Sequence, residues 1–410
     1  MKKIVILPGL LLCTIVVISQ TALPVNWRAY LVRQDSNLVV FNMKTATENG
    51  KTIFYVLNAG EKIKVTAVSV TKDSVNFSMP VFESSFKSKR KPDGSLEGVW
   101  IKGTGGAYQY WPFIALPDQS LRFIKNLGKA KTSISGKWDV TITRANGTLR
   151  KVVAIFKQQN DKLTGTFLTP SGDYRYLEGI VTGDSLKLST FDGAHAYTFY
   201  AKIDNAKNIS GGVFYSGISG KETWIAVKND KAPLPSQDAP TRLREGESKL
   251  NFSFNDLDGK PVSINDERYQ NKVIIIQVLG SWCPNCMDET KFLSEYYNKN
   301  KSRGMEVIGL AYEYTTDLER STRSLQKFQR LFNVQYPLLI TGATAADENK
   351  TEKTLSQLTP IRSFPTTIFI DKKGIVRQIK GTFYGPGTGK YHDDFKKEFY
   401  SIVDGLLNEK

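Results

Sequence analysis

Cysteine and histidine are scarce in this 410-residue chain, which contains three cysteines and two histidines. A structural zinc site normally needs four such ligands and only one C-x-x-C pair is present, so we expect no metal ion and no other cofactor. Copper delivery by the pair plus His392 is disfavoured by the same shortage of ligands. A single structural disulfide between these cysteines would also stabilise the fold little, because closing a loop with only two residues between the cysteines removes little entropy from the unfolded chain. The scarcity directs attention to the pair itself, Cys283-Pro284-Asn285-Cys286.

Long blocks of one charge are also absent from the sequence. The formal charge is +16, but the lysines and arginines are scattered, and the densest cluster, Lys87–Lys91, precedes a Pro-Asp-Gly turn. This distribution is typical of a solvated surface, so we expect no nucleic-acid partner. The composition is that of a globular protein, and the length suggests two or three domains.

The one long apolar run lies at the N-terminus. Ile4–Val17 follows two lysines and precedes the small and polar residues Ser19–Ala22, which is the layout of a secretory signal peptide over residues 1–22. Cleavage near Ala22 would remove Cys13 and leave only the C-x-x-C pair. The alternative is an uncleaved membrane anchor, although a Pro-Gly step inside the run weakens it. We therefore expect a periplasmic or cell-envelope protein, in an oxidising compartment where a surviving vicinal pair indicates catalysis.

The C-x-x-C pair lies between a predicted buried strand, Val273–Leu279, and a predicted helix, Met287–Asn298. Cys283 would then occupy the N-terminus of the helix, where unpaired N–H groups and the helix dipole stabilise a thiolate. We predict that Cys283 is the nucleophile and that Cys286, one turn further in, resolves the mixed disulfide.

The neighbours of the pair support this arrangement. Pro284 suits the first helical position, because its missing N–H would have no intrahelical partner there. Trp282 would shield the two sulfurs. Glu289 follows Cys286 by one helical turn, close enough for a carboxylate to disfavour a second thiolate and to relay a proton. The alternative for Glu289 is a solvated glutamate on the helix surface.

The part of the chain before residue 233 reads as β structure with an internal repeat. Trp27 and Trp138 recur at the same separation as the turns 70–74 and 181–185. Short alternating segments with Asn-Gly and Asp-Gly turns predict two tandem antiparallel all-β modules, and sandwich and barrel both remain open.

The domain boundaries follow from composition. We predict a first β module over residues 23–128 and a second, repeated one over 129–232. A polar, proline-rich linker over residues 233–248 would separate them from a C-terminal domain, residues 249–410. In the second module, the stretches 171–176 and 191–195 are rich in polar and aromatic residues, as binding surfaces often are. We favour the other interpretation, turns and half-buried strand residues, because an aromatic at strand spacing usually belongs to the core.

The C-terminal domain alternates strands and helices. The predicted order β-α-β-α-β-β-α gives a mixed sheet covered on both faces by helices. After the C-x-x-C helix, the predicted elements are a strand at 305–312, a helix at 317–332, a strand at 336–340, a helix at 351–358, two strands within 364–380 and a last helix from His392.

Residues 249–409 resemble the TlpA/ResA-like branch of the thioredoxin superfamily, the exported thiol–disulfide oxidoreductases. The resemblance rests on Asp258-Gly259-Lys260, on Ser281–Glu289 and on Phe364-Pro365-Thr366-Thr367. It implies an α/β thioredoxin-like fold for this part of the chain. Asn285 departs from the family, where proline or glutamate is more usual at that position. The β-rich region resembles those that precede such domains in multi-domain bacterial members.

The resemblance also implies roles for further residues. Pro365 matches the proline that is cis in this superfamily and lies opposite the cysteine pair, where its backbone would help to hold a substrate strand. Glu289 matches an acidic residue that modulates the thiol pKa. The expected substrate-binding residues are Trp282, Pro284, Phe364, Pro365 and Thr366.

The function that we expect is that of an exported disulfide reductase. Its partners would be protein substrates with disulfides and a membrane thiol donor, and the sequence leaves the oligomeric state open. One alternative is a thiol peroxidase of the peroxiredoxin class. Such an enzyme requires a threonine three residues before the reactive cysteine, and this chain has Gly280 at that position. The other is a binding protein whose β modules capture a partner while the redox domain is accessory.

Overall fold

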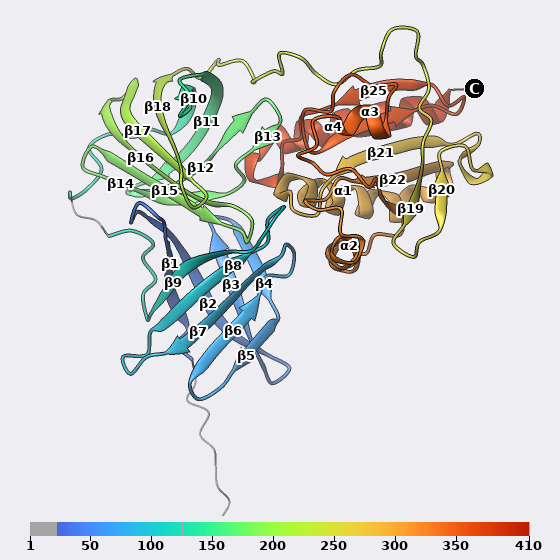
Figure 1. Ribbon diagram of the computed structural model, residues 1–410. Helices are drawn as coiled ribbons and strands as arrows, with labels where there is room; N and C mark the ends of the chain where they lie inside the picture. Colours follow the sequence, from blue (N-terminus) through green and yellow to red (C-terminus); the bar gives the residue numbers. More distant parts are fainter. Residues whose placement is uncertain (1–22, 125–126, 410) are drawn as a thin grey trace, which may run out of the picture.

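The computed structural model of the protein describes residues 23–124 and 127–409 (Figure 1). The expected signal peptide, with Cys13, lies outside these residues. Within the described ranges, no helix combines the length and the apolar character needed to cross a membrane. Two antiparallel β sheets and one mixed sheet with helices follow one another along the chain.

The first sheet is formed by nine antiparallel strands in the order β4-β3-β2-β1-β9-β8-β7-β6-β5. Residues alternate between buried and more exposed along these strands, because successive side chains point to opposite faces of a sheet. The strands are β1 (Asn26–Val32), β2 (Leu38–Glu48), β3 (Lys51–Asn58), β4 (Glu61–Val65), β5 (Ala67–Val70), β6 (Ser74–Ser78), β7 (Ser84–Arg90), β8 (Leu96–Lys102) and β9 (Gln109–Pro117).

The second sheet closes on itself. Its order is β11-β10-β18-β17-β16-β15-β14-β12-β13, and β12 pairs with both β11 and β14. The second module is therefore a barrel, which settles for this module the choice between sandwich and barrel. The strands are β10 (Gly136–Thr143), β11 (Leu149–Gln159), β12 (Lys162–Thr169), β13 (Gly172–Asp173), β14 (Leu177–Thr182), β15 (Ser185–Phe191), β16 (Ala196–Asn205), β17 (Asn208–Ser216) and β18 (Gly220–Lys228).

Corresponding strands of the two sheets carry the repeated tryptophans. Trp27 in β1 and Trp138 in β10 are buried, and so are Trp111 in β9 and Trp224 in β18. The repeated turns connect β5 to β6 and β14 to β15. The expected class for this part of the chain, two tandem all-β modules, is confirmed, whereas the proposed boundaries between the domains stay a prediction.

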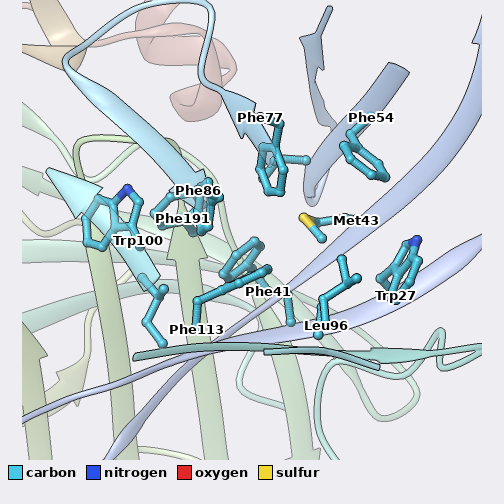
Figure 2. Close-up of a cluster of buried hydrophobic side chains, with 14 of the residues drawn as sticks. Trp27, Phe41, Met43, Phe54, Phe77, Phe86, Leu96, Trp100, Phe113 and Phe191 are labelled. Carbon is cyan, nitrogen blue, oxygen red and sulfur yellow. The ribbon is translucent and has the colours of Figure 1, made fainter. Parts of the chain in front are cut away.

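One aromatic side chain joins the two β modules (Figure 2). Phe191, at the end of β15, lies in the core of the first sheet, with its ring centroid 4.4 Å from that of Phe41 and 5.1 Å from that of Trp100. The Asn58 amide donates to the Phe191 carbonyl at 2.8 Å. Because a buried aromatic pair contributes about 0.5–1.5 kcal/mol beyond its burial, this insertion fixes one module on the other.

The C-terminal sheet has the order β20-β19-β23-β22-β21-β24-β25 and mixes parallel and antiparallel pairs. Helices α1, α2 and α4 contribute to the buried cluster on one face of the central strand β21, and the residues around α3 cover the other. The elements are β19 (Ser253–Asp256), β20 (Pro261–Ser263), β21 (Val273–Leu279), α1 (Pro284–Asn300), β22 (Met305–Ala311), α2 (Leu318–Phe332), β23 (Leu338–Ile340), α3 (Lys350–Thr354), β24 (Thr366–Ile370), β25 (Val376–Lys380) and α4 (Lys390–Asn408).

The segment predicted as a linker is extended but not free. The Gln237 side-chain amide donates to the carbonyl of Gly381 at 2.6 Å and to that of Pro170 at 3.3 Å. One residue of the segment thus connects the second β module to the redox domain.

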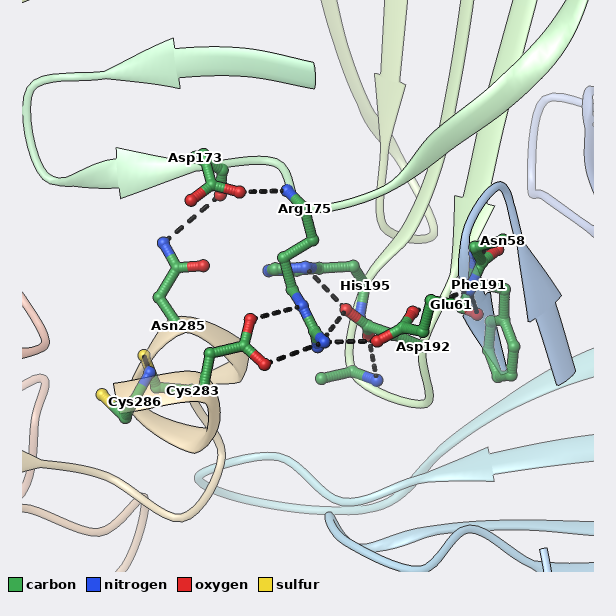
Figure 3. Close-up of polar contacts among 12 residues, drawn as sticks. Asn58, Glu61, Asp173, Arg175, Phe191, Asp192, His195, Cys283, Asn285 and Cys286 are labelled. Atoms are coloured by element: carbon green, nitrogen blue, oxygen red, sulfur yellow. Dashed lines mark hydrogen bonds and ion pairs between the residues drawn. The ribbon is translucent and has the colours of Figure 1, made fainter. Parts of the chain in front are cut away.

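Arg175 holds three parts of the chain together (Figure 3). It lies between β13 and β14, and its guanidinium is paired with carboxylates of Glu61 in β4 at 2.5 Å, Asp192 after β15 at 3.5 Å and Asp288 in α1 at 3.1 Å. Its side chain is 2% exposed, so water and salt screen these pairs little. Asp288 follows Cys286 by two residues, so this Arg175 cluster acts at the start of the redox helix.

The Arg175 cluster places three carboxyl groups around one guanidinium, and the pKa values of these carboxyl groups shift in different directions. Burial raises the pKa of Asp288 to about 6, although Arg175 acts to lower it, and burial also raises the pKa of Glu61. Burial would raise the pKa of Asp192 too, but His195 and Arg175 overcome this effect and lower it. Because the folded state holds the Asp288 proton more tightly than the unfolded chain, this group makes the junction less stable as pH rises from about 4 to above 6.

We predict that Arg175→Met loosens the junction between the β modules and the redox domain. Removing one partner from a buried ion cluster leaves uncompensated charge and costs about 3–5 kcal/mol. Hydrogen exchange of the amides in 172–176 and 284–290 should become faster. Arg377→Met is the control, because its pairs with Asp371 and Glu409 are partly exposed and worth about 1 kcal/mol or less. Equal exchange in both variants would contradict the prediction.

Candidate active site

The two cysteines lie where the sequence predicts, at the junction of β21 and α1, and both are free thiols. Cys283 is the N-cap residue of α1, and its sulfur accepts a hydrogen bond from the Cys286 N–H at 3.2 Å. Pro284 occupies the first helical position, as the sequence predicts, and α1 extends the predicted segment Met287–Asn298 by three residues at its start. An N–H group directed at the sulfur, together with the helix dipole, favours negative charge on Cys283.

Cys286 has the opposite environment. It is fully buried, whereas Cys283 is 6% exposed. Burial, the hydrogen bond to Cys283 and the charge on Cys283 raise the pKa of the Cys286 thiol well above its ordinary value, and the carboxylate of Glu289 adds to this effect. Cys286 therefore keeps its proton while Cys283 reacts, which is the division of labour that the sequence predicts.

Glu289 is a buried carboxyl group and not a solvated one, so the alternative interpretation is wrong. It is 1% exposed, and its oxygens accept hydrogen bonds from the Gln277 amide at 2.8 Å and the Thr367 hydroxyl at 2.5 Å. Burial raises the pKa of Glu289 to about 7, although both hydrogen bonds act to lower it. The same Gln277 amide donates to the Cys286 carbonyl at 3.4 Å, so one side chain links Glu289 to the helix turn that carries Cys286.

The other predicted site residues gather around Cys283. The Trp282 indole N–H donates to the Tyr312 carbonyl at 2.9 Å, and its ring stacks on Tyr314 at 4.9 Å. The peptide bond between Phe364 and Pro365 is cis, as the resemblance implies, and the Phe364 carbonyl lies 3.6 Å from the Cys283 sulfur. Thr366 is buried and its hydroxyl donates to the Ser363 carbonyl, at 2.8 Å.

The first β module covers one side of the cysteine pair. Val81 belongs to the same buried cluster as both cysteines. The adjacent Phe82 has a φ of +63°, a conformation that a bulky residue rarely adopts, so its surroundings must hold it there. Glu83 supplies such a contact, since its carboxylate accepts bonds from the Arg320 Nε in α2 at 2.8 and 3.0 Å.

The second β module touches the C-x-x-C motif itself (Figure 3). The Asn285 side-chain amide donates to the Asp173 carbonyl at 3.3 Å. A Cβ on Gly172 would lie 2.1 Å from that amide nitrogen and 2.9 Å from the Phe383 carbonyl, so the close approach requires glycine. The residue that departs from the family motif thus has a partner in the β module.

A cleft of about 450 Å³ lies between the second β module and the redox domain and opens onto Cys283. Trp282, Pro284 and Phe364 line it from the redox domain, whereas Pro365 and Thr366 are not among its described lining residues. The second β module contributes Ser171, Asp173, Tyr174, His195, Tyr197 and Ser216. The interpretation of 171–176 and 191–195 as turns and half-buried strand residues agrees with their backbone, and Phe191 lies in a core. The same two stretches also contribute residues to the Arg175 cluster and to one wall of the cleft.

Sequence reasoning missed Glu313. This residue is 6% exposed, and its carboxylate accepts bonds from the Ser281 N–H at 2.8 Å and the Ser281 hydroxyl at 2.7 Å, so it fixes the residue that begins the motif. Burial raises its pKa to about 7. A signal was available: Glu313 follows a buried strand, β22, that runs parallel to β21, and the carboxyl ends of parallel strands meet at one edge of a sheet.

Comparison with known proteins supports the resemblance for the C-terminal region. Residues 246–379 match the model of the AhpC/TSA family. The thiol-disulfide oxidoreductase ResA of Bacillus thuringiensis subsp. konkukian is 26% identical over 141 residues, which are 34% of this chain and 72% of that protein. ResA of Bacillus subtilis is 23% identical over 141 residues, or 34% of this chain and 69% of that protein.

Solved structures also align with this part of the chain. A thiol:disulfide interchange protein of Chlorobium tepidum aligns with a TM-score of 0.30 and 22% identity, covering 42% of this chain and all of that one. A secreted thiol-disulfide isomerase of Corynebacterium glutamicum aligns with a TM-score of 0.31 and 18% identity, covering 42% of this chain and 95% of the other. The sequence relatives confirm the expected enzyme class, a thiol–disulfide oxidoreductase with its redox domain at the C-terminus.

We predict that the buried carboxyl of Glu289 makes stability depend on pH. The folded-state pKa of about 7 exceeds the ordinary value of 4.5, so stability falls as pH rises between these values and levels off above them. Glu289→Gln should remove this loss, which is on the order of 3 kcal/mol. Urea unfolding at pH 5 and pH 8 would measure it. Glu295→Gln, on the exposed side of α1, should unfold with the pH dependence of the unaltered protein. If Glu289→Gln does so too, the burial effect is absent.

Proposed function

We propose that this protein is an exported disulfide reductase that uses the dithiol of Cys283 and Cys286 to reduce disulfides in protein substrates. The observation that carries the proposal is the unequal environment of the two sulfurs. Cys283 faces the cleft and accepts an N–H bond at a helix N-terminus, while Cys286 is buried beneath it with a raised thiol pKa.

The reaction would proceed in two exchanges. The Cys283 thiolate attacks one sulfur of the substrate disulfide, and the other sulfur leaves as a thiolate and takes up a proton. Cys286 then gives its proton toward the Glu289 carboxylate and attacks the Cys283 sulfur. The second substrate sulfur leaves as a thiolate and takes up a proton, in place of the one that Cys286 lost. The substrate gains two electrons and two protons, and the protein is left with a disulfide between Cys283 and Cys286.

Glu289 would act as a positioning and proton-accepting group. Its pKa of about 7 allows it to be ionised and to take a proton near neutral pH. Its position on α1, three residues after Cys286, and its link through Gln277 support this role.

Two further parts of the proposal rest on the sequence and on the chemistry. The two lysines and the apolar run before residue 22 support export. A dithiol donor must reduce the Cys283–Cys286 disulfide after each turnover, and for an exported protein we propose a donor held in the membrane. The substrate-binding roles of Trp282, Pro284 and Phe364 are supported by their place in the cleft.

Trapping of the mixed disulfide tests the proposal. In Cys286→Ser the second exchange cannot occur, so Cys283 should remain bonded to a substrate chain. Mass spectrometry after mixing with a disulfide-containing protein should show the adduct at Cys283, and thiols should release it. Cys283→Ser should give no adduct within the same time, because Cys286 is buried. An adduct formed equally well through Cys286 would contradict the assigned roles. Oxidation of the pair by peroxide but by no disulfide would favour the peroxidase alternative.

A further inference from the structure

The cleft at Cys283 does not end at the cysteine pair. Thr169 and Ser171 of the second β module line it, and the same two residues line a neighbouring pocket of about 500 Å³. The neighbouring pocket also contains Arg362 and Ser363, which directly precede Phe364. The two hollows therefore adjoin along the loop that faces Cys283, and we call them together the substrate groove.

The walls of the substrate groove come from different domains and are held in place. The Arg175 cluster fixes the β barrel against α1, and the Gln237 amide bonds to Ser363, at 3.1 Å, and to Pro170. Val81 of the first β module packs in the same buried cluster as both cysteines, next to the groove. A hollow with fixed walls on both sides suits an extended chain segment better than the surface of a folded domain.

The cysteine end of the groove is aromatic. Tyr174, Tyr197 and His195 lie together on the barrel wall, with the rings of His195 and Tyr197 4.5 Å apart. Trp282 and Phe364 face them from the redox domain. Rings on both sides can pack against the side chains that flank a cysteine in a substrate segment.

The far end of the groove is basic. Four of its lining residues are cationic (Arg144, Arg150, Lys151 and Arg362), and one, Asp238, is acidic. Arg150 is paired with Glu222 at 2.7 Å. Arg144, Lys151 and Arg362 are exposed, and within the described part of the chain none of them forms an ion pair with a carboxylate. Lys151 donates a hydrogen bond to the Thr141 hydroxyl at 2.7 Å, which leaves its charge uncompensated. Three cations that are not paired with a carboxylate, beside the single carboxylate of Asp238, would attract an anionic segment.

We infer that the substrate groove binds an extended acidic peptide segment, with its disulfide at Cys283 and its acidic flank at Arg144, Lys151 and Arg362. This inference rests on the proposed reductase function and names the substrate class for the same site. The chemical step is unchanged: the segment's disulfide is reduced to two thiols while the pair Cys283 and Cys286 is oxidised to a disulfide. The β modules then serve to select the substrate.

Three small disulfides test the inference on the full chain in its reduced form. Two are synthetic peptides with the same short disulfide loop, flanked by aspartate and glutamate in one and by lysine in the other. The third is hydroxyethyl disulfide, which is too small to reach the basic end. The readout is the second-order rate of oxidation of the pair, followed by alkylation and mass. We expect the acidic peptide to react at least about tenfold faster than the basic one, and the ratio to fall toward one at high salt.

Two sets of variants locate the effect. Arg144→Gln with Lys151→Gln and Arg362→Gln should lower the rate ratio of acidic peptide to hydroxyethyl disulfide by at least about fivefold. The matched control removes three exposed lysines of the first module, Lys62→Gln with Lys72→Gln and Lys89→Gln, and should leave the ratio unchanged. Ser216→Trp should narrow the groove and lower the ratio of either peptide to hydroxyethyl disulfide, whereas Thr223→Trp, exposed on β18, should not.

The outcomes separate the two proposals. Equal rates for the acidic and basic peptides, or equal losses in the two triple variants, would overturn the acidic-segment inference and leave the reductase standing. An unchanged ratio in Ser216→Trp would overturn the groove. If hydroxyethyl disulfide also fails to oxidise the pair, the reductase function itself is wrong.

Discussion

The ion cluster of Arg175 is the interaction on which the arrangement of this protein depends. One buried guanidinium pairs with carboxylates from the first β module, the second β module and the redox helix. Burial of several charges is unfavourable unless they remain paired, so the cluster is stable only when all three parts are in place. The position of the β barrel beside Cys283, and with it the shape of the cleft, follows from this requirement.

The sequence predicts much of the redox domain, because its motifs are local. The buried strand β21, the proline at the first turn of α1 and the roles of Cys283 and Cys286 all follow from residues close together in the chain. The thioredoxin-like order of strands and helices follows from the resemblance. The repeat of buried tryptophans also indicates that the two β modules share one architecture.

Contacts between domains could not be predicted from the sequence. In the sequence, Asn285 is only a departure from the family motif, and Arg175 is only a residue of a predicted turn. The structure shows that the Asn285 amide donates to the Asp173 carbonyl and that Arg175 pairs with Asp288. Both contacts join residues more than a hundred positions apart in the chain. Closure of the second sheet into a barrel likewise depends on pairing of β12 with β14, which alternating hydrophobicity does not specify.

The redox potential of the pair Cys283 and Cys286 tests the central claim most directly, because exchange chemistry is reversible and the potential sets its direction. Equilibrating the full chain with graded thiol and disulfide buffers, and counting alkylated cysteines by mass, would measure it. A reversible two-electron transition near about −250 mV or below is the result that a reductase requires. A transition near about −120 mV would make the protein an oxidant, and a pair that never forms a bond would contradict the account altogether.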